Sequence, residues 1–383
     1  MNKKRILIVA GEASGDLHGA QLVREMKSEE PGLHFYGVGG GKLKAAGVDL
    51  WANVADMAVV GLTEVLPKLR MILGVMKRLK KSMRSLKPDL VILIDYPDFN
   101  LPLARSAKKN GIPVLYYISP QIWAWRKGRI QTIRRVVDRM AVILPFEEAI
   151  YRQAGVDAFF VGHPLLDVVR PNTSRSETLS RLGLQENVPT VALLPGSRKG
   201  EVNRLLPNML KAAQILKENI KSIQFLLPVA DTLDMEWISG LIAKENSPEV
   251  KLIQGATYDA VAAADVAVVV SGTATLETAL LGTPLIVIYS VSSLTYIIGR
   301  MLISVEHIGL VNIVAGKTVA PELIQHEANP NRIAAEVLSI LNDSGRRKAV
   351  QEELSLLREK LGQPGAARRV AQMALTLMQK QRH

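Results

Sequence analysis

The stretch from Val266 to Pro284 constrains the fold of this chain more than any other part of the sequence. It begins with an uncharged run rich in valine, Val266–Val270, which is typical of a strand buried in a parallel sheet. A turn of small residues follows at Ser271-Gly272-Thr273, and the next residues have a helix-forming composition that ends at Gly282 and Pro284. Free N–H groups and a positive dipole end at the start of such a helix attract anions. The stretch therefore predicts an α/β fold with an anion site above the strand.

Glu277 lies one turn into the same predicted helix, on the side that can face the same ligand. A carboxylate there suits the hydroxyls of a sugar, while the amides of the turn suit phosphate. The combination predicts a site for a nucleotide sugar. The alternative is an ordinary strand–turn–helix unit with a solvated Glu277, because such turns are common in α/β proteins.

Composition sets the scale of the protein and limits its chemistry. With 383 residues, the chain is long enough for about two domains. It has no cysteine, which excludes disulfides and thiolate metal sites and fits a cytosolic location. The basic Lys3-Lys4-Arg5 and the apolar run Ile6–Ala10 look like a signal peptide, but the run is too short, so residues 5–10 are interpreted as the first strand. No stretch is both long and uncharged enough to span a bilayer.

A basic and amphipathic segment, residues 59–84, contributes to a formal net charge of +12, which favours anionic partners. Lysines and arginines crowd around apolar residues at helical spacing, among them Leu66, Leu69, Ile72, Leu73 and Met76. An interfacial helix needs this pattern, because its apolar side chains insert while its cations meet lipid phosphates. The alternative is a core helix with a solvated basic face, and Pro67 and Gly74 interrupt the helical pattern.

Strands and helices alternate through about residue 165 and predict a first doubly wound domain. Open α/β sheets place ligands at the carboxyl ends of their strands, so the loops there are candidate sites. The relevant strand–loop pairs are 5–10 with Gly11–Asp16, 90–94 with Asp95–Asn100, and 114–118 with Ser119–Arg126. Asp95 and Asp98 could supply a general base, although a simple helix cap would also explain them.

A second domain of the same kind begins with the strand Thr190–Leu194. Its first loop, Pro195–Glu201, again places a glycine-rich turn before a helix, and Arg198 could bind a pyrophosphate through two hydrogen bonds. Further strands are expected at 224–228, 250–253 and 285–289. We expect domains at 1–165 and 166–345, with C-terminal helices at 346–383 that pack back on an N-terminal domain.

The six histidines show no spacing typical of a metal site. The Asp-x-Asp pair that commonly holds a divalent metal in nucleotide-sugar enzymes is also absent. We therefore expect a mechanism that uses no metal and no other cofactor.

Five strings, taken in order along the chain, resemble one family of glycosyltransferases. They are Gly11-Glu-Ala-Ser-Gly-Asp16, Asp95-Tyr-Pro-Asp-Phe-Asn100, Ser119-Pro-Gln-Ile-Trp-Ala-Trp-Arg126, Leu194-Pro-Gly-Ser-Arg198 and Ser271-Gly-Thr-Ala-Thr-Leu-Glu277. Together they closely resemble lipid A disaccharide synthase, and the match runs over nearly the whole chain. The resemblance implies a GT-B fold, in which two doubly wound Rossmann-like domains face each other across a cleft.

The resemblance also implies a reaction. UDP-2,3-diacylglucosamine and 2,3-diacylglucosamine 1-phosphate would give a β-1,6-linked tetra-acyl disaccharide phosphate and UDP, with inversion at the anomeric carbon. Asp98 matches the family's proposed general base, and Arg198 matches the arginine expected at the diphosphate. The matching donor-site residues are Gly196, Ser197, Ser271, Gly272, Thr273, Glu277 and Asn312, and the residues assigned to the cleft are Glu12, Ser14, Asp16 and Trp125. The family commonly has proline before this asparagine, whereas this chain has Val311.

Both implied substrates carry acyl chains. The enzyme is therefore expected to be cytoplasmic and to associate peripherally with the anionic surface of the inner membrane through the 59–84 segment. No nucleic-acid partner is expected. The oligomeric state stays open at this point, with a homodimer among the options.

Two other functions also stay open. A UDP-N-acetylglucosamine 2-epimerase shares the two-domain architecture and the turn Gly162-His163-Pro164, and it would release free sugar from the soluble nucleotide sugar. A non-enzymatic nucleic-acid-binding protein would bind RNA with a steep salt dependence and without affinity for UDP. Its basic face would be formed by Arg126, Lys127, Arg129, Arg134, Arg135 and Arg139.

Overall fold

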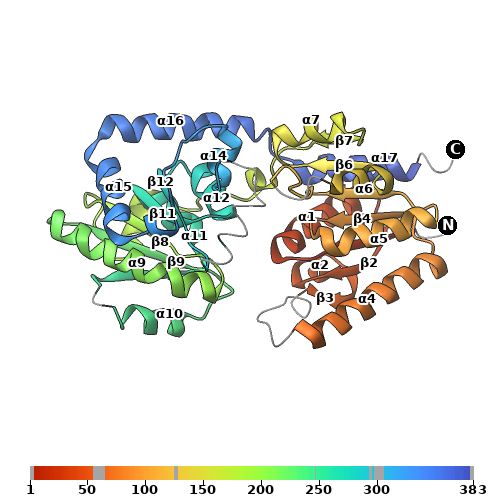
Figure 1. The fold of residues 1–383 in the computed structure, drawn as a ribbon, viewed down its shortest axis with the longest axis horizontal. Coiled ribbons are helices and arrows are strands. Elements are labelled where there is room, and N and C mark those ends of the chain that lie inside the picture. Colours follow the sequence, from red (N-terminus) through yellow and green to blue (C-terminus); the bar gives the residue numbers. More distant parts are fainter. Residues whose placement is uncertain are drawn as a thin grey trace. The chain divides into compact units, whose positions relative to one another are not determined.

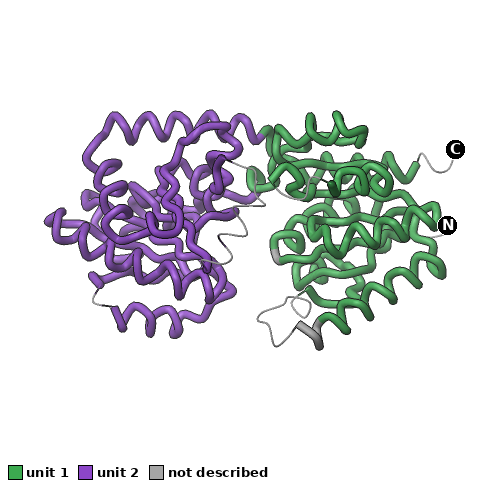
Figure 2. Tube along the Cα trace, viewed as in Figure 1, with its two compact units in different colours: residues 1–167, 362–383 green, residues 168–361 purple. Residues whose placement is uncertain are grey.

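The computed structural model describes residues 4–54, 65–124, 128–245, 247–292, 296 and 306–379, with the backbone alone at residues 13 and 65–68. The chain forms two compact units: unit 1 is residues 1–167 with 362–383, and unit 2 is residues 168–361 (Figure 2). The first division thus falls at 167/168 rather than at the expected 165/166. The expected third segment, residues 346–383, is divided, because its first helix belongs to unit 2 and its last helix to unit 1.

Unit 1 is built on a parallel seven-stranded sheet with the order β3-β2-β1-β4-β5-β6-β7 (Figure 1). Its strands are β1 (Arg5–Ala10), β2 (His34–Gly39), β3 (Val48–Asn53), β4 (Leu90–Ile94), β5 (Val114–Tyr117), β6 (Arg139–Val142) and β7 (Ala158–Phe160). Its helices are α1 (Ala13–Glu29), α2 (Gly41–Ala45), α4 (Val65–Ser85), α5 (Pro97–Lys109), α6 (Arg129–Val136), α7 (Pro145–Gln153), η2 (Pro164–Asp167) and α17 (Ala366–Gln379).

Apolar side chains of unit 1 alternate between the two faces of its sheet, as the strand period of two requires. Leu7 and Val9 of β1 pack in one core with residues of α4, α5, α6 and α7. Ile6 and Ile8 pack in a second core with residues of α1, α2 and α17. All the residues of β4 are buried, which is the pattern of a central strand covered on both faces.

The last helix of the chain completes unit 1. α17 packs against α1 and buries Val370 and Ala374 in the second core. Several hydrogen bonds fix the turn before α17. Among them, the Gly365 amide donates to Asp167 Oδ1 at 2.6 Å, and Arg369 Nε donates to the carbonyl of Val161 at 2.8 Å. The C-terminal residues are therefore a structural part of this unit.

Unit 2 repeats the architecture with a parallel six-stranded sheet in the order β10-β9-β8-β11-β12-β13. Its strands are β8 (Thr190–Leu194), β9 (Gln224–Val229), β10 (Val250–Gln254), β11 (Val266–Val270), β12 (Leu285–Tyr289) and β13 (Glu322–Ile324). Its helices are α8 (Arg175–Arg181), α9 (Lys199–Asn219), α10 (Met235–Ile242), α11 (Thr257–Ala263), α12 (Thr273–Leu280), α14 (Leu310–Ala315), η3 (Gln325–Glu327), α15 (Pro330–Asn342) and α16 (Ser344–Lys360). Residues of α9, α10 and α15 form the larger core with one face of the sheet.

Each sheet has a topological switch point, where the strand order reverses. In unit 1, β1 lies between β2 and β4, and in unit 2, β8 lies between β9 and β11. Parallel α/β sheets bind ligands outside the carboxyl ends of the strands at such points. Most of the site residues expected from the sequence follow these strands: β1, β4, β8 and β11.

Candidate active site

The turn between β11 and α12 is the centre of the candidate site in unit 2. Gly272 is the N-cap residue of α12 and has a φ of 153°, a conformation that side chains rarely tolerate. Gly272 and Thr273 are exposed, and no intrahelical carbonyl lies within reach of the first amides of α12. The Ser271 hydroxyl donates to the carbonyl of Ile308 at 2.9 Å, so it braces the turn. The backbone of this turn can therefore bind an anion.

The turn between β8 and α9 lies beside the β11–α12 turn, because β8 pairs with β11. The turn after β8 contains Gly196 with a φ of 105°, and a Cβ there would come within 2.7 Å of Glu201 Oε2. Arg198 is the N-cap residue of α9, and its side chain is 75% exposed with one nitrogen 2.9 Å from Glu201 Oε1. Ser197 is exposed, and its carbonyl accepts a hydrogen bond from Thr232. The guanidinium and two helix starts together give a positive site at the switch point of unit 2.

Glu277 has a partner that the sequence did not reveal. The Tyr258 hydroxyl, on α11, donates to Glu277 Oε1 at 2.9 Å. Burial raises the pKa of Glu277, and the Tyr258 hydrogen bond acts in the opposite direction. Burial, followed by the charge of Glu277, raises the pKa of Tyr258, so the tyrosine stays the donor. The carboxylate is thus held in one orientation at the side of the turn.

The Asn312 side chain is fully buried inside unit 2. It uses all of its hydrogen-bonding atoms within that unit. The amide nitrogen donates to Ala320 O and Glu322 Oε1, both at 2.8 Å, and the oxygen accepts from the amides of Val319 and Ala320 at 2.8 and 2.9 Å. Asn312 therefore shapes this loop, and its expected contact with the donor stays a prediction.

Glu322 was also missed from the sequence. Its carboxylate accepts hydrogen bonds from the amides of Ile308 at 2.9 Å and Gly309 at 3.0 Å, besides the one from Asn312. Because the Ile308 carbonyl accepts a hydrogen bond from Ser271, the loop that Glu322 holds is connected to the turn between β11 and α12. Glu322 is the first residue of a three-residue edge strand, and nothing in its local sequence signals this role.

In unit 1, Asp98 lies in the first turn of α5 and is exposed, whereas Arg129 at the start of α6 is mostly buried. The two side chains form an ion pair. An ion pair with one exposed partner adds little stability, but it orients the carboxylate. Arg129 is a further residue that sequence reasoning did not connect with the site.

The turn before Asp98 has an unusual backbone. Asp95 and Tyr96 both have a φ of 46°, in the left-handed region that residues other than glycine rarely adopt. Asn100 Nδ2 and the Tyr116 hydroxyl both donate to the Asp95 carbonyl, at 2.7 and 2.5 Å. The Tyr96 ring covers Gly11, where a Cβ would lie 2.1 Å from the ring. Strained residues held by several contacts are typical of functional sites.

A second carboxyl group lies in the same turn. Burial, followed by the charge of Glu12, raises the pKa of Asp95 to about 6. Glu12 is exposed at the end of β1, which pairs with β4, so both acids lie at the switch point of unit 1. Asp98 is therefore the exposed carboxylate of this site and Asp95 the partly buried one.

The other residues assigned to the cleft have different positions. Asp16 is buried and accepts hydrogen bonds from the amides of Gly40 at 2.6 Å, Lys42 at 3.0 Å and Leu43 at 3.1 Å, so it fixes the start of α2. Its side chain is used in the fold, contrary to the expectation that it faces a ligand. Ser14 is exposed in the first turn of α1. Trp125 lies outside the described residues.

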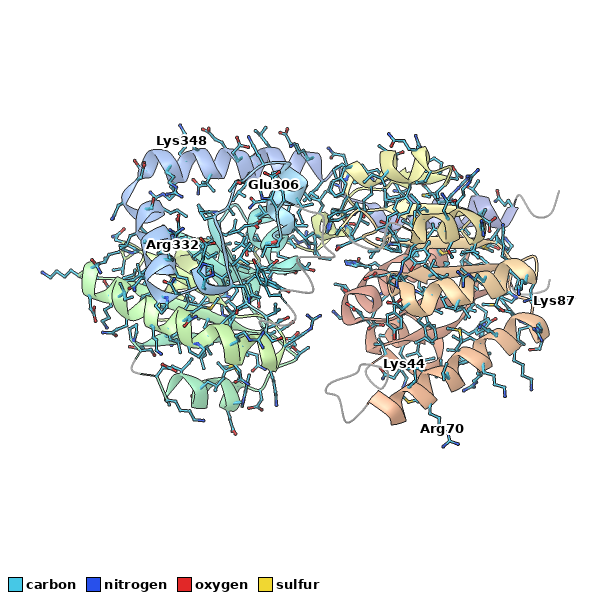
Figure 3. All side chains as sticks on the ribbon, viewed as in Figure 1. Lys44, Arg70, Lys87, Glu306, Arg332 and Lys348 are labelled. Carbon is cyan, nitrogen blue, oxygen red and sulfur yellow. The ribbon has the colours of Figure 1, made fainter. Side chains whose placement is uncertain are left out.

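The predicted interfacial segment forms α4, and its apolar residues divide between two environments. Ile72 and Met76 are partly buried against the core of unit 1. Leu69 and Leu73 are exposed, at 47% and 59%, and the side chain of Leu66 lies outside the description. Arg70 on the same helix points away from unit 1 (Figure 3). Within the described ranges, none of the helices is long and apolar enough to cross a membrane.

Solved structures share this fold at low sequence identity. MurG from Acinetobacter baumannii has a TM-score of 0.61 at 15% identity, covering 97% of this chain and 99% of that one. The calicheamicin glycosyltransferase CalG4 has a TM-score of 0.60 at 14% identity, covering 99% of both chains. A UDP-GlcNAc 2-epimerase from Neisseria meningitidis, bound to UDP-GlcNAc, has a TM-score of 0.63 at 10% identity, covering 98% of this chain and 100% of that one. The chain therefore has the GT-B fold that glycosyltransferases and epimerases share.

Sequence similarity narrows this class to one family. The lipid-A-disaccharide synthetase family matches residues 6–377. A lipid-A-disaccharide synthase from Syntrophus aciditrophicus is 76% identical over 380 residues, covering 99% of each sequence, and one from Geobacter sulfurreducens is 50% identical over 377 residues, covering 98% of each. The chain belongs to the lipid-A-disaccharide synthase family and is a glycosyltransferase of lipid A biosynthesis. Family membership, rather than the fold, separates it from the 2-epimerases and from the nucleic-acid-binding alternative.

Proposed function

We propose that the enzyme joins UDP-2,3-diacylglucosamine to 2,3-diacylglucosamine 1-phosphate with inversion at the anomeric carbon. The products are a β-1,6-linked tetra-acyl disaccharide 1-phosphate and UDP. The observation that carries this proposal is the pair of switch points: a positive turn with Glu277 in unit 2, and a strained turn with exposed Asp98 in unit 1.

Unit 2 holds the donor in this proposal. The amides of Ser271-Gly272-Thr273 and the Arg198 guanidinium bind the diphosphate, and Glu277 accepts hydrogen bonds from the ribose hydroxyls. When the bond between the anomeric carbon and the diphosphate oxygen breaks, its electron pair leaves with UDP. Fixed donors aimed at that developing charge stabilise the transition state more than the ground state.

Unit 1 activates the acceptor. The Asp98 carboxylate takes the proton of the acceptor 6-hydroxyl as that oxygen bonds to the anomeric carbon of the donor. A positioned general base of this kind contributes roughly 10²–10⁴-fold to the rate. Arg129 keeps the carboxylate in one orientation, and the Asp95–Tyr96 turn fixes the start of the helix that carries it.

The exposed face of α4 brings the enzyme to its lipid substrates. Leu69, Met71 and Leu73 are exposed on this helix, and Arg70 is exposed beside them. We place the enzyme peripherally on the anionic cytoplasmic surface of the inner membrane, where each nearby Lys or Arg contributes about 1 kcal/mol. Apolar insertion by the exposed leucines adds to this attraction.

A transfer assay tests the proposal. Radiolabelled 2,3-diacylglucosamine 1-phosphate is incubated with UDP-2,3-diacylglucosamine, and the lipids are separated by thin-layer chromatography. The expected result is a labelled disaccharide with a β linkage at the new anomeric carbon, determined by NMR coupling. An α-linked product would contradict inversion, and the absence of any labelled disaccharide would contradict the substrate assignment.

A further inference from the structure

One helix holds the loop that follows β5. The loop begins at Ser119-Pro120 and includes Trp123. The Tyr151 hydroxyl of α7 donates to the Pro120 carbonyl at 2.7 Å, and Trp123 Nε1 donates to Glu147 Oε1 at 2.9 Å. The Trp123 and Phe146 rings also meet edge to face, with centroids 5.1 Å apart. Because Glu147 and Tyr151 are four residues apart, they lie on one face of α7 and fix both parts of the loop.

Burying the acidic side chain of Glu147 beside this loop is energetically unfavourable. Its side chain is only 1% exposed, and burial raises its pKa to about 7. Leu144, the N-cap residue of α7, donates its amide to Glu147 Oε2 at 3.3 Å. A cap at a helix start does not require a buried acid, since exposed acids cap α-helices equally well. Capping alone therefore does not explain why Glu147 is buried, whereas its hydrogen bond with Trp123 does.

The loop leads directly to the acceptor-side site. It leaves the carboxyl end of β5, next to β4, whose following turn carries Asp95 and Asp98. After residues 125–127, which lie outside the described part, the chain continues into α6, and its first residue is Arg129. Arg129 is the ion-pair partner of Asp98. Trp123, which α7 holds in place, thus lies six residues before Arg129 along the chain.

We propose that Glu147 is a positioning residue for the transfer reaction: through Trp123 it holds the 119–124 loop so that Arg129 stays paired with Asp98. This inference rests on the proposed role of Asp98 as the general base. Glu147 touches neither substrate. Its effect reaches the acceptor through the loop, so it acts on the acceptor half of the reaction and not on the binding of UDP.

Two variants test the proposal. Trp123→Phe removes the N–H donor and keeps an aromatic ring against Phe146, while Glu147→Leu removes the acceptor and keeps roughly the size of the side chain. Each is expected to lower kcat for transfer by about tenfold, the effect of losing one buried hydrogen bond, without changing the affinity for UDP. The neighbouring Glu148→Gln, which loses only an ion pair with Arg152, is the matched control and should keep normal turnover.

A double-mutant cycle separates positioning from simple destabilisation. If Glu147 acts through the Arg129–Asp98 pair, Trp123→Phe has no further effect on kcat in the Asp98→Asn background. Full additivity of the two changes, or turnover within twofold of wild type in both single variants, would overturn the inference. Near-normal turnover of Asp98→Asn by itself would instead overturn the proposed function, so the two failures are distinguishable.

Discussion

Tyr258 donates a 2.9 Å hydrogen bond to Glu277 and thereby occupies one of its two carboxylate oxygens. In the proposed donor site, the other oxygen accepts a hydrogen bond from a ribose hydroxyl at the β11–α12 turn. Such an arrangement selects a ligand hydroxyl at one fixed position, because the carboxylate cannot rotate without losing the tyrosine. Tyr258 comes from α11 and Glu277 from α12, so the relationship depends on the packing of two helices in unit 2.

Removing the Tyr258 hydroxyl should weaken nucleotide binding. Tyr258→Phe frees the carboxylate and is expected to raise the dissociation constant for UDP about tenfold, the effect of one hydrogen bond to a charged group. Glu277→Gln should weaken UDP binding at least as much and should abolish the preference for UDP over its 2′,3′-dideoxy analogue. Isothermal titration measures both constants. Tyr36→Phe, which removes a buried hydroxyl in unit 1, is the control, and equal affinity of all three variants would contradict the ribose contact.

Turnover should depend on the carboxylate of Asp98. Asp98→Asn keeps the shape of the side chain but removes the proton acceptor, so kcat is expected to fall by at least ~100-fold. The control is Asp157→Asn, because Asp157 also forms an exposed ion pair with an arginine of unit 1, Arg139. Initial rates of disaccharide formation measure the effect. Similar rates for the two variants would remove Asp98 from the role of base.

Glu147 should leave a signature in the pH dependence of stability. The unfolded chain loses the Glu147 proton near pH 4.5, whereas the folded chain keeps it until about pH 7. Between these two pKa values the folded state therefore binds more protons than the unfolded state. The free energy of unfolding falls by about 3 kcal/mol as the pH rises from 4.5 to 7. The Gln side chain of Glu147→Gln does not titrate in this range. The free energy of unfolding of the variant, relative to that of wild type, should therefore rise with pH.

Urea unfolding of both proteins between pH 4.5 and pH 7.5 measures that difference. Burial lowers the pKa of His18 to about 4 and that of His163 to about 3, so these groups destabilise the fold as the pH falls. Their contribution is the same in wild type and variant and cancels in the comparison. A stability difference that stays constant over the pH range would show that Glu147 does not titrate near neutral pH.

The two kinds of apolar residue on α4 should respond differently to replacement. Leu69→Ser and Leu73→Ser are expected to weaken binding to anionic liposomes without loss of stability, because both side chains are exposed. Ile72→Ser and Met76→Ser should destabilise unit 1, because these side chains pack against its core. Liposome sedimentation and thermal unfolding measure the two effects. Leu356→Ser, at an exposed leucine of α16, is the matched control, and unchanged liposome binding of the Leu69 and Leu73 variants would end the membrane assignment.

The strands that form the centres of the sheets could be predicted from composition. The run Val266–Val270 and the run Leu90–Ile94 are strands with the expected bounds, because strands covered on both faces consist almost entirely of apolar residues. The edge strand Val48–Asn53 was missed, since its mixed polar sequence carries no such pattern. Glu322–Ile324 was missed because three residues are too few for a periodic signal.

The helix α4 was predicted with interruptions that are absent. It runs without a break from Val65 to Ser85. Pro67 falls in the first turn, where its missing N–H has no intrahelical partner to lose. Gly74 lies in the middle, where a glycine costs only about 1 kcal/mol relative to alanine.

The positions of the site turns could be predicted, but the partners of their side chains could not. Glycine-rich loops after strands identify Gly196 and Gly272 from local sequence, and the turn around Asp98 is identified by its place at the end of the strand Leu90–Ile94. Tyr258 and Arg129 are separated from their partners by 19 and 31 residues. Only the packing of helices within each unit brings each pair together. For Asn312, too, the partners could not be predicted, because its hydrogen bonds to residues 319–322 depend on the fold of that loop, and its expected contact with the donor stays a prediction.

A crystal structure of the enzyme with UDP would show whether unit 2 holds the donor as proposed. We expect the diphosphate to lie against the amides of Ser271-Gly272-Thr273 and the Arg198 guanidinium, with a ribose hydroxyl hydrogen-bonded to Glu277 beside Tyr258. UDP bound to another part of the chain, with Glu277 still paired only to Tyr258, would contradict it.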